Sequence, residues 1–278
     1  MIKPITELLS QTVDSIEKRY QNQGKFTGIA TGYKTLDAHT DGFQKGELVI
    51  LGARPSVGKT AFALNMIMNM LYDKVSVGMF SIEMPAWLLL YRLISLTKLI
   101  DSTSLRTGKL EGNDMEMVIA AANYLSATQL WLCDEPSLYI NNLEKIAEEM
   151  VKNYAIKILF VDYITLIRPQ TKGIPRHEQV SDISQRLKGL ARKLEIPVVA
   201  VSQVKREVEG RYPNLSDLRE SGSLEQDADV VLLLHRDRDK EEFLKNSAKL
   251  WIAKNRNGPI GMVKMDFLPQ YMKFSEEL

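Results

Sequence analysis

A glycine-rich segment that ends in a lysine and a threonine carries the strongest chemical signal in the sequence. Residues 52–60 read GARPSVGKT and fit the pattern G-x-x-x-x-G-K-[ST]. In such a loop, backbone N–H groups bind phosphate oxygens, Lys59 meets the β- and γ-phosphates, and the Thr60 hydroxyl ligates Mg²⁺. The segment predicts a site for a nucleoside triphosphate with Mg²⁺, formed by Gly52, Ala53, Arg54, Pro55, Ser56, Val57, Gly58, Lys59, Thr60 and Ala61.

Two carboxylates follow apolar runs that read as strands. Asp162 ends the run ILFVD and is the expected acid that holds Mg²⁺ through water beside a phosphate loop. Glu83 follows the run Val75–Ser81 and precedes Pro85, a residue suited to start a helix. Glu83 is therefore either a base that deprotonates an attacking water or an acid favoured by a helix N-terminus, and its position alone supports both interpretations equally.

An uncharged amide stands at the end of a third apolar run. Gln203 follows Val198–Ser202, and its side chain both donates and accepts hydrogen bonds, as a sensor of the γ-phosphate requires. A surface glutamine at a strand end is the simpler interpretation. His39, His177 and His235 lack metal-ligand spacing, so we interpret them as structural.

Alternating short β-branched runs and longer helical patterns must position these residues. Alternation of this kind is typical of βαβ units with right-handed crossovers, so we expect an α/β fold with a mostly parallel central sheet flanked by helices. The expected strands are 47–51, 75–81, 129–133, 156–161, 198–202, 230–234, 249–253 and 262–267, and the expected helices are 59–71, 86–99, 114–125, 143–153 and 178–194.

An amphipathic helix is predicted ahead of this domain, over residues 4–20. Its apolar side chains recur at spacings of three and four and need a partner. The polar, glycine-containing segment 21–35 reads as a linker. The helix either packs away from its own domain or folds back on it, and the pattern favours neither.

Composition and charge exclude several classes of protein. Of 278 residues, 45% are hydrophobic and 26% are charged, which excludes a disordered chain. The formal net charge of +1 leaves only a local basic surface for a nucleic-acid partner. The single cysteine, Cys133, fits a reducing compartment. Neither a signal peptide nor a membrane span is predicted, so we expect a soluble, cytoplasmic protein.

Six segments in a fixed order make the sequence resemble one family. They are GARPSVGKT (52–60), FSIEMP (80–85), ILFVDYITLI (158–167), VVAVSQVKRE (198–207), DLRESGSLEQDADVVLLLHR (217–236) and AKNRNGPIG (253–261). Together they resemble the RecA-like ATPase domain of bacterial and phage DnaB-type replicative helicases. TGIATGYKTLD (27–37) resembles the start of that domain, and the helix before it resembles the family's linker helix. The resemblance thus implies a linker helix and flexible linker over 1–26 and an ATPase domain over 27–278.

The resemblance assigns roles at the ATP site. It implies that Glu83 is the catalytic base, that Asp162 is the acid of the Mg²⁺ site, and that Gln203 couples the phosphate state to DNA loops. It also implies that Lys254 and Arg256 reach the ATP of a neighbouring subunit. An aromatic ring within 267–271 is expected near the adenine.

The resemblance also assigns contacts to single-stranded DNA. It implies that Arg219, Glu220 and Gly222 contact the DNA backbone. Basic residues in two loop regions would supply phosphate contacts that read no bases: Lys172, Arg176, Lys205, Arg206, Arg211 and Arg219. By charge alone, a solvated surface is the simpler interpretation of these six residues.

The function that the resemblance implies is a motor that hydrolyses ATP with Mg²⁺, translocates on single-stranded DNA and unwinds duplex DNA. A hexameric ring is expected, with primase and a helicase loader as further partners. Family members carry an N-terminal helical domain before the linker, whereas this sequence begins at the linker. Two alternatives remain open: a recombination ATPase of the RecA or RadA type, and a regulatory ATPase of the KaiC type.

Overall fold

The computed structural model describes residues 4–21, 24, 26–169, 173, 175–204, 212–218, 222–236 and 246–277, and its centre is a nine-stranded sheet. The strand order is β3-β2-β4-β5-β1-β6-β7-β8-β9. The first six strands in this order run parallel, and β7, β8 and β9 extend the sheet in antiparallel fashion. The strands are β1 Leu48–Ala53, β2 Val77–Ser81, β3 Leu130–Cys133, β4 Ile158–Asp162, β5 Val198–Gln203, β6 Val230–His235, β7 Ser247–Asn255, β8 Gly261–Leu268 and β9 Lys273–Glu276.

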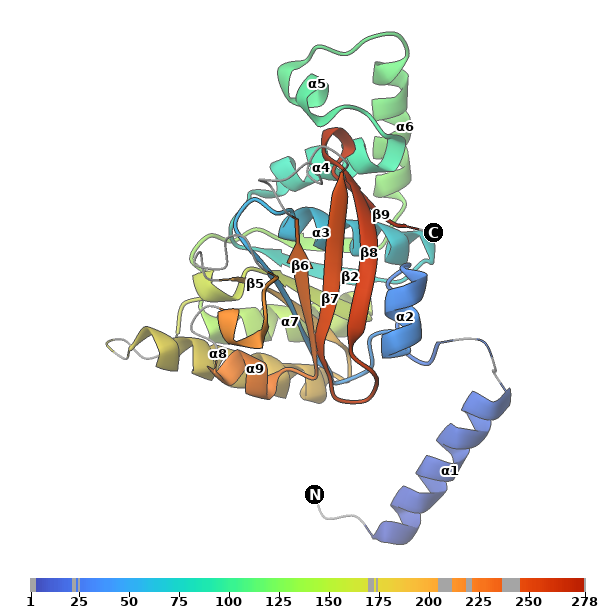
Figure 1. Cartoon of the computed structure of the whole chain (residues 1–278), viewed down its shortest axis with the longest axis vertical. Coiled ribbons are helices and arrows are strands. Elements are labelled where there is room, and N and C mark those ends of the chain that lie inside the picture. The colour runs from blue at the N-terminus through green and yellow to red at the C-terminus, as the bar shows by residue number, and fades with distance from the viewer. Residues whose placement is uncertain are drawn as a thin grey trace.

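Helices cover both faces of the sheet (Figure 1). In the described part of the chain they are α1 Ile5–Gln21, α2 Lys34–Thr40, α3 Lys59–Tyr72, α4 Ala86–Lys98, α5 Ser102–Thr107, α6 Asp114–Ser126, α7 Ile140–Tyr154, α8 Arg176–Leu194 and α9 Gly222–Asp227. Short 3-10 helices span Ile164–Leu166, Leu215–Asp217 and Pro269–Tyr271. The expected α/β fold with a mostly parallel sheet is confirmed.

Successive residues of the central strands point to opposite faces and build two separate cores. Val49 and Leu51 of β1 pack in the core that contains α3, whereas Leu48 and Ile50 pack in the core that contains α7 and α8. All four side chains are fully buried. Burial on both faces explains why these strands are apolar at nearly every position, instead of alternating between apolar and polar residues.

The parallel arrangement brings the ends of several strands to one edge of the sheet. Ala53 pairs with Gln203 on the neighbouring β5, and Ser81 of β2 pairs with Asp162 of β4. Loops that follow these strands therefore emerge together. This edge, here called the carboxyl edge, is where the sequence places the phosphate loop.

The segment before β1 is packed more closely than the linker interpretation of 21–35 predicts. Thr31 is fully buried, and its backbone N–H and hydroxyl each donate to one Asp37 carboxylate oxygen at 2.8 Å. Ile29 forms a bridge with Phe43. The linker interpretation was therefore wrong for residues 27–35. Their glycines and threonines serve this compact turn, and the sequence pattern does not distinguish such a turn from a linker.

Helix α1 lies apart from the rest of the molecule in Figure 1. Its stripe of apolar side chains is exposed, from 44% at Leu8 to 74% at Tyr20. Of the two interpretations left open by the sequence, the structure supports a helix that packs away from its own domain. In the described part of the chain, no helix is both long and apolar enough to cross a membrane.

Among the α-helices and strands of the described residues, four were not predicted, namely α2, α5, α9 and β9. All are short, with four to seven residues each. Strand β9 has the sequence KFSE, which is too short to show an alternating pattern, and it is held by pairing with β8, where Phe267 lies opposite Phe274. Short elements of this kind depend on tertiary partners more than on their own sequence pattern.

Candidate nucleotide-binding and catalytic site

The loop between β1 and α3 is shaped to surround an anion. Gly58 has φ 114° and immediately precedes the first residue of α3. A side chain there would be strained, and a Cβ would lie 3.1 Å from the Phe274 ring. The loop therefore directs the N–H groups of the first turn of α3 toward the carboxyl edge, where the helix dipole also favours negative charge.

Lys59 connects the two carboxylates that follow the neighbouring strands. Its Nζ lies 2.8 Å from Glu83 Oε2 and 3.1 Å from Asp162 Oδ1. It also lies 4.3 Å from the centroid of the Tyr163 ring. Lys59 and Asp162 are buried, whereas the Glu83 side chain is 42% exposed. The structure thus brings together three predicted residues from α3, β4 and the loop after β2.

Oxygen ligands suited to Mg²⁺ are present in the same place. Thr60 Oγ1 donates a 2.6 Å hydrogen bond to Asp162 Oδ2, and both residues are buried. A hydroxyl and a carboxylate are ligand types that Mg²⁺ accepts beside phosphate oxygens. The donor set therefore fits the predicted metal, which Thr60 and Asp162 would hold.

A cavity of about 730 Å³ opens over this cluster. Its walls combine the loop with the C-terminal strands: Ser56, Gly58, Lys59, Thr60, Ala61, Glu83, Met84, Arg92, Arg236, Phe267, Pro269 and Met272. Phe267 and Pro269 fall within the segment 267–271 that the resemblance places near the adenine. Phe267 itself stacks on Phe274, with 4.2 Å between ring centroids, and on the Arg236 guanidinium.

Arg92 lines this cavity and was missed in the sequence. It lies on α4, and burial lowers the pKa of its guanidinium, while the carboxylates of Asp162 and Glu83 oppose that shift. An arginine near two carboxylates and Lys59 adds positive charge to a cavity predicted to bind phosphates. The available signal was a single arginine inside an otherwise apolar helical segment, WLLLYRLISL.

Gln203 lies at the same edge, one strand away from the loop. It ends β5 and pairs in register with Ala53, the last residue of β1. The next residue, Val204, donates its backbone N–H to the Ala53 carbonyl at 3.0 Å. Gln203 therefore ends the strand next to the one that leads into the phosphate loop, and its role as a sensor stays a prediction.

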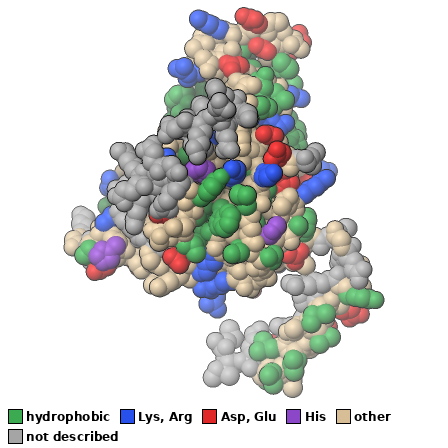
Figure 2. Space-filling model, in the orientation of Figure 1, with side chains coloured by type: hydrophobic (Ala, Val, Ile, Leu, Met, Phe, Trp, Pro, Cys, Tyr) green, Lys and Arg blue, Asp and Glu red, His purple; other side chains and the backbone are tan. Residues whose placement is uncertain are grey.

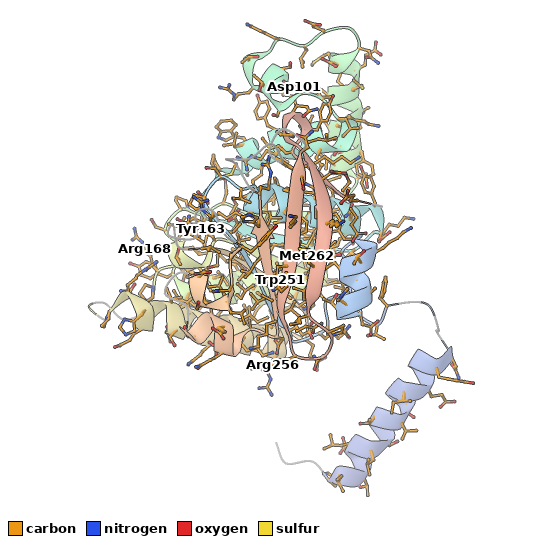
Figure 3. All side chains as sticks on the ribbon, viewed as in Figure 1. Asp101, Tyr163, Arg168, Trp251, Arg256 and Met262 are labelled. Carbon is orange, nitrogen blue, oxygen red and sulfur yellow. The ribbon has the colours of Figure 1, made fainter. Side chains whose placement is uncertain are left out.

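Lys254 and Arg256 lie at the opposite edge of the sheet, here called the amino edge. Lys254 pairs with Val231 at the beginning of β6, and β6 in turn begins beside the beginning of β1. Figure 3 shows Arg256 near the lower end of the sheet, well below Tyr163. The structure therefore does not bring these two cations to the chain's own phosphate loop.

Both cations are held by backbone carbonyls of α9. Lys254 Nζ donates to the Glu225 carbonyl at 2.6 Å, and Arg256 Nη2 donates to the Gln226 carbonyl at 2.8 Å. Arg256 Nη1 lies 3.3 Å from Asp229 Oδ1. Burial, followed by the neighbouring Arg256 cation, lowers the pKa of Lys254.

The predicted DNA contacts are only partly covered. Arg219 and Glu220 lie outside the described residues, whereas Gly222 begins α9. Among the basic residues, Lys172, Lys205, Arg206 and Arg211 also lie outside them. Arg176 begins α8 and donates to the Gln179 side chain and to the Thr165 carbonyl.

Known proteins of one family match nearly the whole chain. The model of the DnaB-like helicase C terminal domain matches residues 28–276. The chain is 44% identical over 273 residues to the replicative DNA helicase DnaB of Treponema pallidum, and 42% identical over 279 residues to that of Geobacillus stearothermophilus. Each match covers 98% of this chain but only 61% and 62% of the relative, so the chain spans about three fifths of these proteins.

Solved structures give the same result. One solved ATPase domain superposes with a TM-score of 0.92 at 35% identity, and the match covers 99% of both chains. A DnaB-like replicative helicase, solved in a study of its interactions with primase, superposes with a TM-score of 0.89 at 35% identity, and the match covers 99% of this chain and 67% of the other. With its phosphate loop, its carboxyl-edge acids and these relatives, the chain belongs to the DnaB-like helicase C-terminal domain family, which has a RecA-like fold.

Proposed function

We propose that the chain is the motor domain of a replicative DNA helicase, which hydrolyses ATP with Mg²⁺ to translocate on single-stranded DNA and unwind duplex DNA. One observation carries the proposal: Lys59 Nζ lies 2.8 Å from Glu83 and 3.1 Å from Asp162 inside a cavity of a DnaB-like domain. Phosphate binding, metal binding and water activation are thereby assigned to adjacent side chains.

The chemistry within one chain follows from these positions. The loop N–H groups and Lys59 bind the phosphates, and Thr60 and Asp162 would hold Mg²⁺, which would neutralise phosphate charge. Glu83 is half-exposed beside Lys59, so its carboxylate can accept a proton from an incoming water. Gln203, at the end of β5, reports the γ-phosphate to the following loop.

A neighbouring copy completes the site in this proposal. Lys254 and Arg256 face away from the chain's own loop, and the Arg256 side chain is 48% exposed. Cations in such positions can stabilise phosphate charge in another subunit during the transition state. A homo-oligomer, in the form of a hexameric ring with ATP between subunits, places them there.

Two exposed apolar surfaces support self-association. One is the stripe on α1, which belongs to the proposed linker region 1–26 ahead of the ATPase domain 27–278. The other lies over β7 and β8, where Figure 2 shows hydrophobic side chains gathered and Trp251 lies opposite Met262. Exposed apolar patches of this kind are typical of protein interfaces.

Single-stranded DNA is the proposed track, and primase and a helicase loader are further proposed partners. Contacts by Arg219, Glu220 and Gly222 would bind the backbone without reading bases, so affinity would fall steeply with salt. A role in replication places the protein in the cytoplasm, where the chromosome is copied.

The test measures ATP turnover and strand separation together. We expect single-stranded DNA to stimulate turnover and a fluorescently labelled forked duplex to be unwound only with Mg²⁺ and ATP. The Lys59→Ala variant serves as the inactive control. Light scattering with ATP and an oligonucleotide reports assembly in the same samples.

Other outcomes identify other functions. Pairing of homologous strands without unwinding would indicate a recombination ATPase. ATP turnover that single-stranded DNA does not change would indicate a regulatory ATPase. Either result would overturn the helicase proposal.

A further inference from the structure

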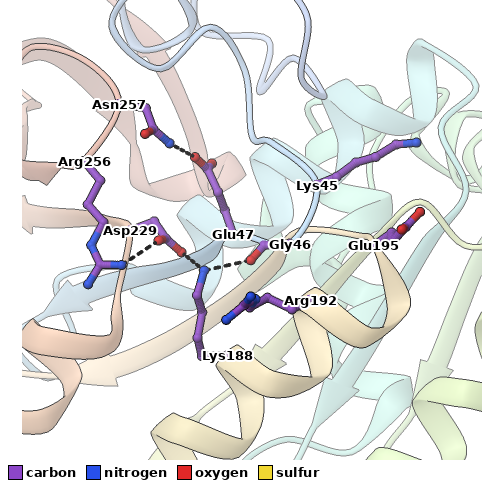
Figure 4. Close-up of a pocket in the computed structure, with 9 residues that line it drawn as sticks. All are labelled: Lys45, Gly46, Glu47, Lys188, Arg192, Glu195, Asp229, Arg256 and Asn257. Carbon is purple, nitrogen blue, oxygen red and sulfur yellow. Dashed lines mark hydrogen bonds and ion pairs between the residues drawn. The ribbon is translucent and has the colours of Figure 1, made fainter. Parts of the chain in front are cut away.

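A buried carboxylate lies behind the two cations at the amino edge. Asp229 immediately precedes β6, and its side chain is 8% exposed. Together with Lys188, Arg256 and Asn257 it lines a cavity of about 600 Å³, shown in Figure 4. The cavity lies at the amino edge and is separate from the phosphate loop at the carboxyl edge.

Asp229 is anchored to the sheet on its own side. Its Oδ2 accepts the Leu48 backbone N–H at 2.8 Å, and its own backbone N–H donates to the Leu48 carbonyl at 2.9 Å. Because Leu48 begins β1, the strand that leads into the phosphate loop, the Asp229 carboxylate is held by the rigid centre of the fold. Groups supported in this way keep their geometry better than groups on loops alone.

Asp229 holds Arg256 at two points. The Arg256 backbone N–H donates to the Asp229 carbonyl at 2.9 Å, and Arg256 Nη1 lies 3.3 Å from Asp229 Oδ1. The Gln226 carbonyl receives Nη2 at 2.8 Å. Both the backbone and the guanidinium plane of Arg256 are therefore oriented, while half of its side chain remains exposed.

Lys188 keeps this contact from becoming a closed ion pair. Its Nζ lies 2.5 Å from Asp229 Oδ2 and donates to the Gly46 carbonyl at 2.8 Å, as the dashed lines in Figure 4 show. Since Lys188 already balances the Asp229 carboxylate, Asp229 by itself does not neutralise the Arg256 guanidinium. The guanidinium can therefore still attract phosphate oxygens.

We propose that Asp229 is a positioning residue that orients Arg256 toward the ATP of a neighbouring subunit, with Lys188 supplying the balancing charge. This inference rests on the proposed function, in which Arg256 acts between subunits. Misplacing a reacting group by about 1 Å can cost about 10²-fold in rate. Loss of the Asp229 carboxylate is therefore expected to reduce turnover about ten- to a hundredfold, without weakening ATP binding by the same chain.

The experiment separates chains that supply a phosphate loop from chains that supply Arg256. Arg256→Ala chains keep the loop and serve as acceptors, and Lys59→Ala chains keep the arginine and serve as donors. A donor with both Lys59→Ala and Asp229→Asn is compared with the Lys59→Ala donor. The matched control donor carries Lys59→Ala and Glu195→Gln, because Glu195 lines the same cavity and is exposed.

We expect turnover to be restored by the Lys59→Ala donor and by the control donor that also carries Glu195→Gln. The donor that carries Lys59→Ala and Asp229→Asn should restore about ten- to a hundredfold less turnover. In the reverse direction, Asp229→Asn chains with an intact loop should be rescued by Lys59→Ala donors. A purely structural defect would abolish both directions, so this asymmetry identifies a positioning role. Equal rescue by all three donors would overturn the proposal for Asp229.

Failure of the Lys59→Ala donor itself would instead refute the site between subunits, so the two inferences fail separately. The change Asp229→Asn leaves Lys188 without its anion, which destabilises a partly buried amine. A second donor with Asp229→Ser and Lys188→Met removes both charges and keeps a hydroxyl acceptor for the Leu48 N–H. This donor should show the same loss of rescue, and normal rescue by it would also overturn the proposal.

Discussion

The two edges of the sheet hold their charged groups in different ways. At the carboxyl edge, Lys59 Nζ contacts two carboxylates within the same chain, and the cavity above them is lined by loop and strands together. At the amino edge, carbonyls of α9 hold Lys254 and Arg256, Asp229 also holds Arg256, and Arg256 is 48% exposed. The carboxyl edge is a nearly complete site, whereas the amino edge presents cations outward.

This difference follows from strand direction. Parallel strands bring their carboxyl ends to one edge, which gathers the phosphate loop and both acids. The antiparallel strand β7 runs the other way and delivers its last residues to the amino edge. Under the proposed function, this difference predicts that the chain binds nucleotide by itself but requires a second copy for fast hydrolysis.

The largest expected effect is at the carboxyl edge. Lys59→Ala should reduce ATP turnover to background and weaken nucleotide binding, because it removes the charge that meets the β- and γ-phosphates. Turnover is measured by phosphate release and binding by a fluorescent ATP analogue. Wild-type turnover in this variant would show that the nucleotide site lies elsewhere.

A substitution at the amino edge should have an almost equally large effect, but only on the rate of ATP hydrolysis. Arg256→Ala should slow hydrolysis about 10³- to 10⁵-fold, the range for an arginine that stabilises transition-state charge. ATP binding should persist because the loop is intact. Wild-type specific activity should rise with protein concentration as oligomers form.

A specific activity that does not depend on protein concentration would contradict the proposal that one edge binds ATP and the other acts on the ATP of a neighbouring subunit. So would an absence of rescue when Arg256→Ala chains are mixed with Lys59→Ala chains.

Glu83→Gln distinguishes the two interpretations of that residue. The amide keeps the shape and loses the base, so hydrolysis should fall by about 10²-fold or more while ATP still binds. Equilibrium binding and single-turnover hydrolysis are measured on the same preparation. If binding is lost instead, Glu83 has a structural role near α4 and another group activates the water.

The smallest effect concerns pH at the amino edge. Because the pKa of Lys254 is lowered, its amine loses its proton at a lower pH than an ordinary lysine does. The neutral amine cannot stabilise phosphate charge, so turnover should decline as pH rises through this pKa. Lys254→Arg keeps the charge at all these pH values and should move the decline upward. Identical alkaline profiles for the two proteins would exclude Lys254 as its cause.

The helices and strands with strong patterns could be predicted from the sequence alone. Eight of the nine described strands and the long helices lie close to their expected ranges, because each carries an extended apolar pattern of its own. The phosphate loop and Asp162 were likewise visible, since a loop of fixed spacing and the acid at a strand end are local features.

Other features depend on contacts between distant residues. Strand β9 exists through its pairing with β8, and the packed turn around Thr31 exists through the Asp37 carboxylate. Arg92 reaches the cavity only because α4 lies beside the carboxyl edge. No spacing in the sequence encodes these distances.

The sequence by itself determined the parallel α/β core, the phosphate loop and the acids beside it, because local patterns and strand direction place them together. Only the tertiary structure decided where Lys254 and Arg256 lie and what holds them. Their partners, Asp229 and the carbonyls of α9, come from separate segments and depend on the antiparallel run of β7. The sequence shows that Lys254 and Arg256 are present, but the direction in which their side chains face depends on the folded sheet.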